Sequence, residues 1–390
     1  MNQQFFFPSD YQAEWQAEFA HNTSQQIKWV QQALNKIMGL RLTVDGIAGP
    51  QTRSAIRNFQ RRQGLVVDGI VGTKTKAALS SALTGRPVPS TKTPTASTHP
   101  ESVIFGLDTA SIADNRNPNW PQARTEGLIH FAIIRSNWGV WEDSVFKRDW
   151  PIMKQAGIVR GAYLFLRFPH PKHQMKAPDP VSQAKALIKT VGNLEPSDLP
   201  PTIDVEFPGS RRVTGMTARQ CLDGVRAAWK VIKAYYGVAP IIYTSRRVWR
   251  EDLDDLPAPD LAESPLWLAR YPFKKGLAVR DARVSRLNPP PIPLPWGDAT
   301  NWWIHQYQGD AIRLPGFPTG NVDMNRFNTM QRGAIGDRVK WVQRRLGIQQ
   351  NGQFDDTMQR VLRTFQHKKG LISNGIIDPR TFAHLCWLNP

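Results

Sequence analysis

Apolar residues along the chain follow two different periods, and the change between them separates a central block from two ends. In the central block, short apolar runs alternate with stretches of helical spacing. The expected strands are 103–108, 129–135, 158–166, 201–206, 239–244, 265–271 and 302–307, and the expected helices include 145–156, 181–191 and 217–236. This alternation over about 230 residues predicts an α/β fold, a barrel of parallel strands wrapped by helices.

The two ends of the chain repeat each other. Residues 28–31 recur as 340–343, residues 57–60 as 363–366, and Asp68-Gly69-Ile70 as Asn374-Gly375-Ile376. The apolar spacing of each copy predicts three short helices, and Pro50 suits the first turn of one of them. We therefore expect a small three-helix all-α domain at each end of the barrel.

A Pro/Ser/Thr-rich stretch separates the first copy from the central block. Residues 85–100 contain four Pro and six Ser or Thr, a composition typical of an extended linker. The expected domains are an N-terminal arm, a first module, the linker, the barrel and a second module, with the bounds 1–23, 24–84, 85–100, 101–330 and 331–390.

Composition excludes several classes of protein. The 390 residues are 41% hydrophobic and 21% charged, which excludes fibrous and wholly disordered chains. No apolar run reaches the roughly 20 residues of a membrane span. Cys221 and Cys386 are too few and too far apart for a disulfide framework or a cysteine metal site. The start of the chain lacks the pattern of a secretory signal, so we expect a cytoplasmic protein.

Net charge is the unusual property. The chain has 50 basic and 32 acidic residues, a net charge of +18, and the two repeats carry +7 and +6 of it. Nucleic acid, a bacterial wall and a membrane surface are all polyanions that such a charge attracts. Concentration of the charge in the repeats indicates binding modules, although each basic residue alone is equally compatible with a solvated helix face.

Four acidic residues lie at or near the ends of extended segments. Asp108 ends the first expected strand, Asp204 and Glu206 end the strand 201–206, and Asp323 follows another extended stretch. Catalytic groups of such barrels lie where strands end. Asp204 and Glu206 face the same side of a strand, roughly 6–7 Å apart at the backbone, which suits the acid and the charged partner of glycoside hydrolysis. The alternative is a strand end with two solvated acids.

Aromatic residues are dense on the same strands. Tyr163 and Phe165 alternate on one strand, Trp267 and Tyr271 on another, and Tyr307 ends a third. Their rings suit stacking on sugars, and core packing is the alternative for each of them. His305 is expected to be a packed, hydrogen-bonded histidine. The sequence shows no metal-ligand spacing, no phosphate-binding glycine loop and no serine nucleophile elbow, so neither a metal nor a cofactor is expected.

The central block resembles the family 25 glycoside hydrolases, the Chalaropsis-type lysozymes. The residues that carry the resemblance come in the family's order over about 101–327, and they are Phe105-Gly106-Leu107-Asp108, 131–135, 161–165, Ile203-Asp204-Val205-Glu206, 266–271, Gln306-Tyr307 and Val322-Asp323-Met324-Asn325. The flanking repeats resemble the three-helix peptidoglycan-binding module, most closely at 67–72 and 75–79.

The resemblance implies a role for each matching residue. Glu206 would be the general acid, Asp204 would assist at the anomeric centre, and Asp108 and Asp323 would shape the site. The implied contacts to the sugar chain are Tyr163, Phe165, Trp267, Tyr271, Gln306 and Tyr307, and those to the wall are Trp29, Asp68 and Trp341. The implied fold is an irregular TIM-like barrel with fewer helices than strands, and the implied bond is the β-1,4 link from N-acetylmuramic acid to N-acetylglucosamine. The identity of the nucleophile stays open.

These features favour a monomeric peptidoglycan hydrolase with two tethered wall-binding modules, a phage endolysin held in the host cytoplasm until release. The alternatives are a non-enzymatic wall-binding or virion protein with a decayed barrel, a nucleic-acid-binding protein, and a secreted autolysin or injected effector. Two departures from the families stand out. His305 replaces a usual Trp, and Asn351-Gly352 and Asn374-Gly375 replace Asp-Gly, so the second module is expected to have altered or lost its ligand preference.

Overall fold

The computed structural model describes residues 25, 27–63, 71, 73–84, 103–111, 117–272, 284, 287, 291–297, 301–311, 314–317 and 322–388. The expected arm, residues 1–23, and the expected linker, residues 85–100, lie outside these described residues. The chain divides into two compact units, residues 1–99 and 100–390.

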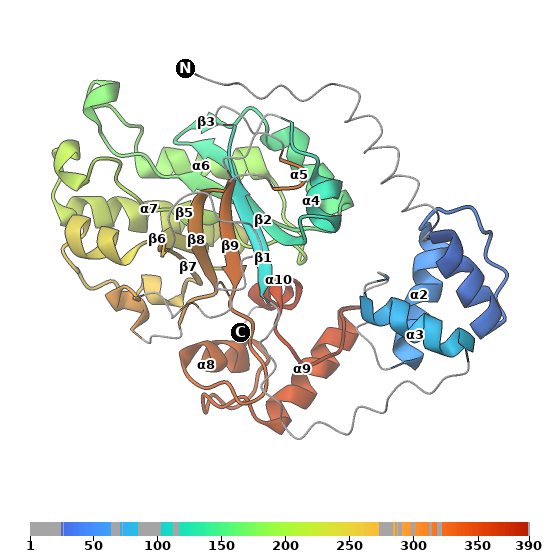
Figure 1. Ribbon diagram of the computed structural model, residues 1–390. Helices are drawn as coiled ribbons and strands as arrows, with labels where there is room; N and C mark the ends of the chain where they lie inside the picture. Colours follow the sequence, from blue (N-terminus) through green and yellow to red (C-terminus); the bar gives the residue numbers. More distant parts are fainter. Residues whose placement is uncertain are drawn as a thin grey trace, which may run out of the picture. The chain divides into compact units, whose positions relative to one another are not determined.

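The second unit contains a closed barrel of eight strands (Figure 1). The strands are β1 (Ile104–Thr109), β2 (Ile129–Trp138), β4 (Val159–Phe165), β5 (Thr202–Asp204), β6 (Ile241–Thr244), β7 (Leu266–Ala269), β8 (Ile304–Ala311) and β9 (Val322–Phe327). The order is β1-β9-β8-β7-β6-β5-β4-β2, and β2 pairs back onto β1. A short β3 (Trp141–Glu142) extends β2 as a hairpin. The predicted barrel is confirmed, with one difference: β9 runs antiparallel to both of its neighbours.

Helices cover only part of the barrel, as the sequence predicts. The connections between β1 and β6 carry α4 (Trp120–Thr125), α5 (Phe146–Gln155), α6 (Pro180–Val191) and α7 (Ala218–Tyr236), and the described parts of the connections from β6 to β8 hold only short helical turns. The longest, α7, begins with a capping box between Thr217 and Gln220. No helix of the described residues has the length and apolar character needed to cross a bilayer.

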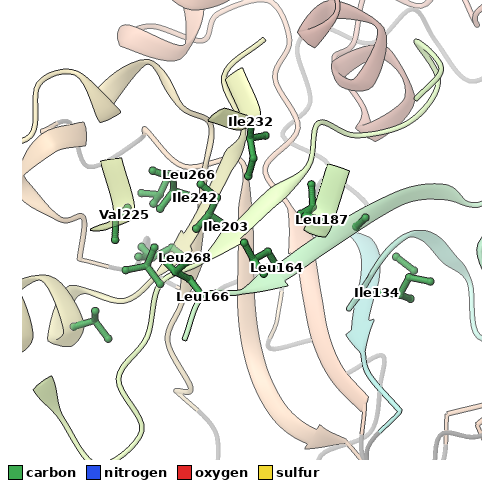
Figure 2. Close-up of a cluster of buried hydrophobic side chains, with 14 of the residues drawn as sticks. Ile134, Leu164, Leu166, Leu187, Ile203, Val225, Ile232, Ile242, Leu266 and Leu268 are labelled. Carbon is green, nitrogen blue, oxygen red and sulfur yellow. The ribbon is translucent and has the colours of Figure 1, made fainter. Parts of the chain in front are cut away.

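Period-two alternation on the strands separates the site from the core. Ile203 of β5 points outward into an apolar layer that also contains Leu187 of α6 and Val225 of α7 (Figure 2). Val205, which follows β5, belongs to the same buried cluster. The intervening residues of β5, Thr202 and Asp204, therefore face the barrel interior. Burial of the outward row thus fixes which face of each strand supplies the chemistry.

The C-terminal module shares a hydrophobic core with the barrel. Its helices are α8 (Asp337–Arg345), α9 (Asp356–Lys368) and α10 (Pro379–Cys386). Trp303, which precedes β8, stacks on Phe382 of α10 with ring centroids 4.3 Å apart, and Trp341 of α8 packs against both rings. The expectation of two tethered modules is therefore wrong for this one, because its apolar face is used by the barrel.

Polar contacts support the same interface. Arg380 donates to the carbonyl of Gly157 at 2.9 Å, and the Trp387 indole N–H donates to the carbonyl of Asp198 at 2.7 Å. Gly157 and Asp198 precede β4 and β5, so the module lies at the N-terminal ends of the parallel strands. In barrels of this kind that end contributes stability and the opposite end chemistry.

The N-terminal module has the predicted three helices, formed by residues 27–38, α2 (Pro50–Arg62) and α3 (Thr73–Thr84). A glutamine in the first helix holds the loop that follows. Gln31 donates to Asp45 Oδ1 at 2.8 Å and accepts from the N–H of Gly46 at 3.0 Å.

The C-terminal module repeats this glutamine clamp twice. Gln343 clamps Asn351 and Gly352, and Gln366 clamps Asn374 and Gly375, at 2.5–3.2 Å. In the three clamps that the structure describes, the Asp or Asn accepts through a side-chain oxygen. Exchange of Asp for Asn at these positions therefore preserves the loop, and an altered ligand preference of the second module stays a prediction.

Candidate active site

All four predicted acids lie at one end of the barrel, where the parallel strands end. Asp108 lies near the end of β1, and Asp204 is the last residue of β5, with Glu206 two positions beyond it. Asp323 lies near the start of β9, directly opposite Asp108 in the antiparallel ladder. The reversed direction of β9 is what brings its first residues to this end, away from the C-terminal module.

One amide connects two of the acids to two phenols. Gln306 Nε2 donates to Asp108 Oδ1 at 2.8 Å and to Asp323 Oδ2 at 3.1 Å. Its Oε1 accepts from the hydroxyls of Tyr243 and Tyr271 at 2.7 and 2.5 Å. Because both donors and the acceptor of the amide are used, the orientation of Gln306 is fixed. Gln306 was expected to contact the sugar chain. In the structure it lies at the site, between Asp108 and Asp323, and holds these two side chains in place.

The side-chain amide of Asn325 also holds Asp108. Asn325 Nδ2 donates to Asp108 Oδ1 at 2.7 Å, and Asn325 Oδ1 accepts from the Trp267 indole N–H at 2.8 Å. Trp267 is only 2% exposed and packs edge-on against Tyr163 and Tyr243. It therefore holds the site in place from inside the barrel, and the expected sugar contact is not available to its ring.

Mutual repulsion and burial make these acids hard to ionise. Burial raises the pKa of Asp108 well above its ordinary value, and the nearby Asp323 charge raises it further. Burial and the Glu206 charge do the same for Asp204. The pKa of Glu206 is raised by burial and by Asp323, and the Arg247 charge lowers it. The acids therefore titrate as a set, with protons retained above the usual range of carboxyl groups.

Asp204 has an oxygen that no described residue satisfies. Its Oδ1 is enclosed and lacks a hydrogen-bond partner within the described part of the chain. The Arg135 guanidinium is close enough to lower the pKa of Asp204, and Arg135 is itself held by Asp143 at 2.8 Å. A buried acceptor beside a fixed cation is suited to receive a donor from a ligand.

Glu206 opens onto a cleft of about 400 Å³. The cleft is lined by Glu206, Tyr243, Thr244, Ser245, Arg246, Arg247, Val248, Ala269, Arg270, Tyr271 and Pro291. Tyr271 is 52% exposed there, whereas Asp204 is only 6% exposed. The two members of the Asp-x-Glu pair therefore differ in environment: Glu206 faces the cleft, and Asp204 lies deeper.

The other aromatic residues expected to contact the sugar lie on two different faces of their strands. Tyr163 is buried inside the barrel, and Phe165, two residues on, is half-buried nearer the mouth. Tyr307 is 1% exposed and belongs to the outer apolar layer with Phe105, on the face of β8 opposite Gln306. The expected sugar contact of Tyr307 is therefore corrected, because adjacent strand residues point to opposite faces.

His305 is packed, as the sequence predicts. Its ring accepts from Arg326 Nε at 3.0 Å and lies 2.9 Å from the carbonyl of Arg270. Burial and the Arg326 charge lower its pKa to about 3. An uncharged imidazole on the outer side of the strand, with both ring nitrogens in hydrogen bonds, is not placed for proton transfer at the mouth.

Sequence reasoning missed two residues of the site, Tyr243 and Asn325. Tyr243 pairs with Asp204 in the parallel ladder and so occupies the same row. Asn325 follows Asp323 by two positions on β9 and therefore shares its face. The alternation that identified the acids would also have identified both of them.

The predicted wall-binding residues fall in three different situations. Trp29 is half-buried against the core of the N-terminal module. Trp341 is 8% exposed and lies in the core shared with the barrel. Asp68 lies outside the described residues. Within the described ranges, no group of three or more metal-ligating side chains lies close enough to hold an ion.

Comparison with known proteins assigns most of the chain. The family model described as glycosyl hydrolases family 25 matches residues 108–316, and that of a peptidoglycan binding domain matches residues 23–79 and 335–385. The uncharacterized protein YegX of Escherichia coli K12 is 26% identical over 211 residues, 53% of this chain and 62% of that protein. Lysozyme M1 of Streptomyces globisporus is 25% identical over 214 residues, 54% and 63% of the two chains.

This chain thus spans about three fifths of the length of these curated relatives. Among solved structures, the bacterial lysozyme from Streptomyces coelicolor is 24% identical and superposes with a TM-score of 0.47, over 58% of this chain and 93% of that one. The family model covers more than half of the residues and all of the barrel strands from Asp108 of β1 to β8. The chain therefore belongs to family 25 of the glycosyl hydrolases.

Proposed function

We propose that this protein hydrolyses the β-1,4 bond between N-acetylmuramic acid and N-acetylglucosamine in bacterial peptidoglycan. The observation that carries the proposal is the pair formed by Glu206, at the cleft, and the deeper Asp204, both with a raised pKa. The two matches to the peptidoglycan binding domain favour this polymer over other β-linked glycans.

Glu206 is the general acid in this proposal. Its raised pKa keeps the carboxyl protonated closer to neutral pH than an ordinary glutamate, as an acid catalyst requires. It transfers its proton to the glycosidic oxygen as the bond from that oxygen to the anomeric carbon breaks. The sugar on the leaving side departs with a new hydroxyl, and Glu206 is left as a carboxylate that can later take a proton from water.

Asp204 assists at the anomeric carbon. Its unpartnered Oδ1 is placed to accept the N–H of the substrate's acetamido group, and the Arg135 charge favours the ionised form that accepts it. Positive charge develops on the sugar ring in the transition state, and a nearby carboxylate stabilises it. Bond formation at the anomeric carbon by the acetamido oxygen or by Asp204 gives the same overall hydrolysis.

The biological setting is a further part of the proposal. The basic charge of both modules suits an acidic wall or outer surface, and a wall-binding N-terminal module on the same chain would raise the effective concentration of the barrel on a polymer. A monomeric endolysin, held in the host cytoplasm and released at lysis, uses all of these features.

Digestion of purified peptidoglycan by the wild type and by Glu206→Gln tests the proposal. Mass analysis of the reduced fragments should show reducing-end N-acetylmuramic acid with the wild type, and a loss of roughly 10²–10⁴-fold in rate with the variant. Reducing-end N-acetylglucosamine would assign a glucosaminidase, and cleaved peptides would place the chemistry elsewhere. Wall binding without any fragments would support a non-enzymatic wall-binding protein.

A further inference from the structure

A tryptophan hairpin lies at the same end of the barrel as the acids. Trp138 and Trp141 are paired across the two-residue turn that joins β2 and β3. Gly139, in that turn, has φ +65°, and its N–H donates to the carbonyl of Phe165 at 3.0 Å. A Cβ at Gly139 would lie 3.0 Å from Arg167 Cδ, so the turn is seated tightly on the segment that follows β4.

Arg167 lies against this hairpin, and no described residue serves as its counter-ion. Its guanidinium carbon is 3.7 Å from the ring centroid of Trp138 and 5.0 Å from that of Trp141. The residue is 5% exposed, and desolvation lowers its pKa. The side chain has no hydrogen bond or ion pair within the described part of the chain, yet its nitrogens are not sealed from solvent.

The two acids that directly follow Trp141 in the hairpin are paired with other cations. Glu142 pairs with Lys147 at 2.8 Å, and Asp143 pairs with Arg135 at 2.8 Å. A largely buried cation without a carboxylate partner is unfavourable in a structural role. The flat guanidinium face is covered by indole, which leaves the N–H edge available to an incoming anion.

The hairpin is in register with the proposed site. Trp138 pairs with Phe165, and Phe165 pairs with Asp204. Two strand spacings therefore separate Trp138 from Asp204, about 10 Å at the backbone. The cleft beside Glu206 is lined from β6 and β7, on the other side of β5. A glycan that crosses the mouth from this cleft past Asp204 would next reach the hairpin.

We propose that Trp138, Trp141 and Arg167 form a second sugar subsite, specific for a sugar that carries a carboxylate. The exposed Trp141 ring, at 52%, offers a stacking face, and Arg167 receives the carboxylate. This proposal rests on the proposed function. In that substrate the carboxylate belongs either to the lactyl group of a peptide-free muramyl sugar or to the stem peptide of a substituted one.

Calorimetric binding to the full chain tests the subsite. The chain carries Glu206→Gln, so that ligands stay intact, and three ligands are compared: peptide-free muramyl oligosaccharides, the same oligosaccharides with stem peptides, and chitin oligosaccharides, which lack carboxylates. Trp141→Ala should weaken binding of all three by about tenfold, because each stacks a sugar. Arg167→Gln should weaken only the carboxylate-bearing ligands, by roughly ten- to a hundredfold.

Matched controls are Tyr235→Ala, an aromatic residue of similar exposure on the outer helix α7, and Arg219→Gln on the same helix. Neither should change any affinity. The ligand arm that responds to Arg167→Gln identifies the source of the carboxylate, lactyl or stem. Equal losses on chitin and muramyl ligands in Arg167→Gln would overturn the carboxylate assignment, and unchanged affinities in both Trp141→Ala and Arg167→Gln would overturn the subsite.

Turnover by chains with an intact Glu206 separates this proposal from the proposed function. In that background the two subsite variants should raise KM on peptidoglycan with little change in kcat. A wild type that binds with the expected selectivity but releases no fragments would overturn the hydrolase and leave the subsite standing.

Discussion

Trp303 and Phe382 stack face to face with ring planes 26° apart, one from the barrel wall and the other from the last helix. Phe327 of β9 packs on both rings, so the bottom of the barrel and the C-terminal module form one apolar cluster. Elements that share a core in this way unfold together.

Phe382→Ala should therefore destabilise the barrel as well as the module. The loss should be about 3–5 kcal/mol in the free energy of unfolding, because a fully buried ring leaves a cavity. Chemical denaturation, followed by near-UV dichroism, measures it. Leu34→Ala, in the core of the N-terminal module, is the control and should leave the barrel transition in place. An unchanged barrel midpoint in Phe382→Ala would contradict a common core.

The pH profile of hydrolysis should move in opposite directions in two variants. With Glu206 as the proposed general acid, activity should fall as pH rises through its pKa, because the acid must be protonated. Asp323→Asn removes a charge that raises this pKa, so the alkaline limb of kcat/KM should move to lower pH. Arg247→Gln removes a charge that lowers it, so the limb should move to higher pH.

Arg246→Gln is the control for this pair. Arg246 lines the same cleft but pairs with Asp255, and its charge is not among those that set the pKa of Glu206. Its profile should keep the wild-type limb even if the rate falls. Shifts of the same sign in Asp323→Asn and Arg247→Gln would show that another group limits the reaction.

Asp204→Asn should stabilise the protein at neutral pH while it removes activity. The folded-state pKa of Asp204 is raised, so its stabilising contribution is complete only below the unfolded value of about 3.9 and is lost as pH rises through the folded value. Replacement by the neutral amide should add about 1 kcal/mol or more at pH 7. Thermal unfolding should show this gain shrinking as the pH falls from the folded pKa of Asp204 toward about 4, and vanishing below it.

Asp198→Asn is the matched control and should lower the free energy of unfolding. Asp198 is equally buried but holds Arg160 at 2.6 Å, and loss of one partner from a buried ion pair costs about 3–5 kcal/mol. A stabilised Asp198→Asn, or a destabilised Asp204→Asn at pH 7, would be inconsistent with these assignments.

The glutamine clamps predict which changes the modules tolerate. Asn374 Oδ1 accepts from Gln366 and from the N–H of Ile376. Asn374→Asp keeps this oxygen and should change stability by less than about 0.5 kcal/mol, whereas Asn374→Ala should cost about 1–2 kcal/mol. Denaturation of the full chain, with a wall pull-down on both variants, provides the measurement. A loss of wall binding in Asn374→Asp with stability intact would assign this position to the ligand.

The strands and the four acids could be predicted from the sequence because both depend on local pattern. Seven expected strands correspond to β1, β2, β4, β5, β6, β7 and β8, and Asp108 and Asp204 lie near their ends as expected. The strand β9 was visible only as an extended stretch, because its inward positions, Asp323 and Asn325, are polar. The sugar contact of Tyr307 was implied by the resemblance alone, and strand alternation places Tyr307 on the face opposite Gln306.

The shared core was harder to predict, since it joins residues far apart in the chain. The repeat itself indicated two equivalent modules, and Trp29 and Trp341 occupy the same place in each copy. One difference carried the signal: the exposed Lys76 of the first copy corresponds to Phe382 in the second. An apolar residue on a face that is otherwise solvated indicates a covering partner.

The common core of the barrel and the C-terminal module fixes the distance between this module and the active-site mouth. If this module binds the wall as proposed, a bound glycan would keep a fixed position relative to the mouth, because the module and the barrel share a core. The distance along the polymer between the module and the active-site mouth would therefore be the same in every complex. A hydrolase with such a fixed spacing would release glycan fragments of preferred lengths. A binding module on a flexible hinge would give a broad distribution of fragment lengths.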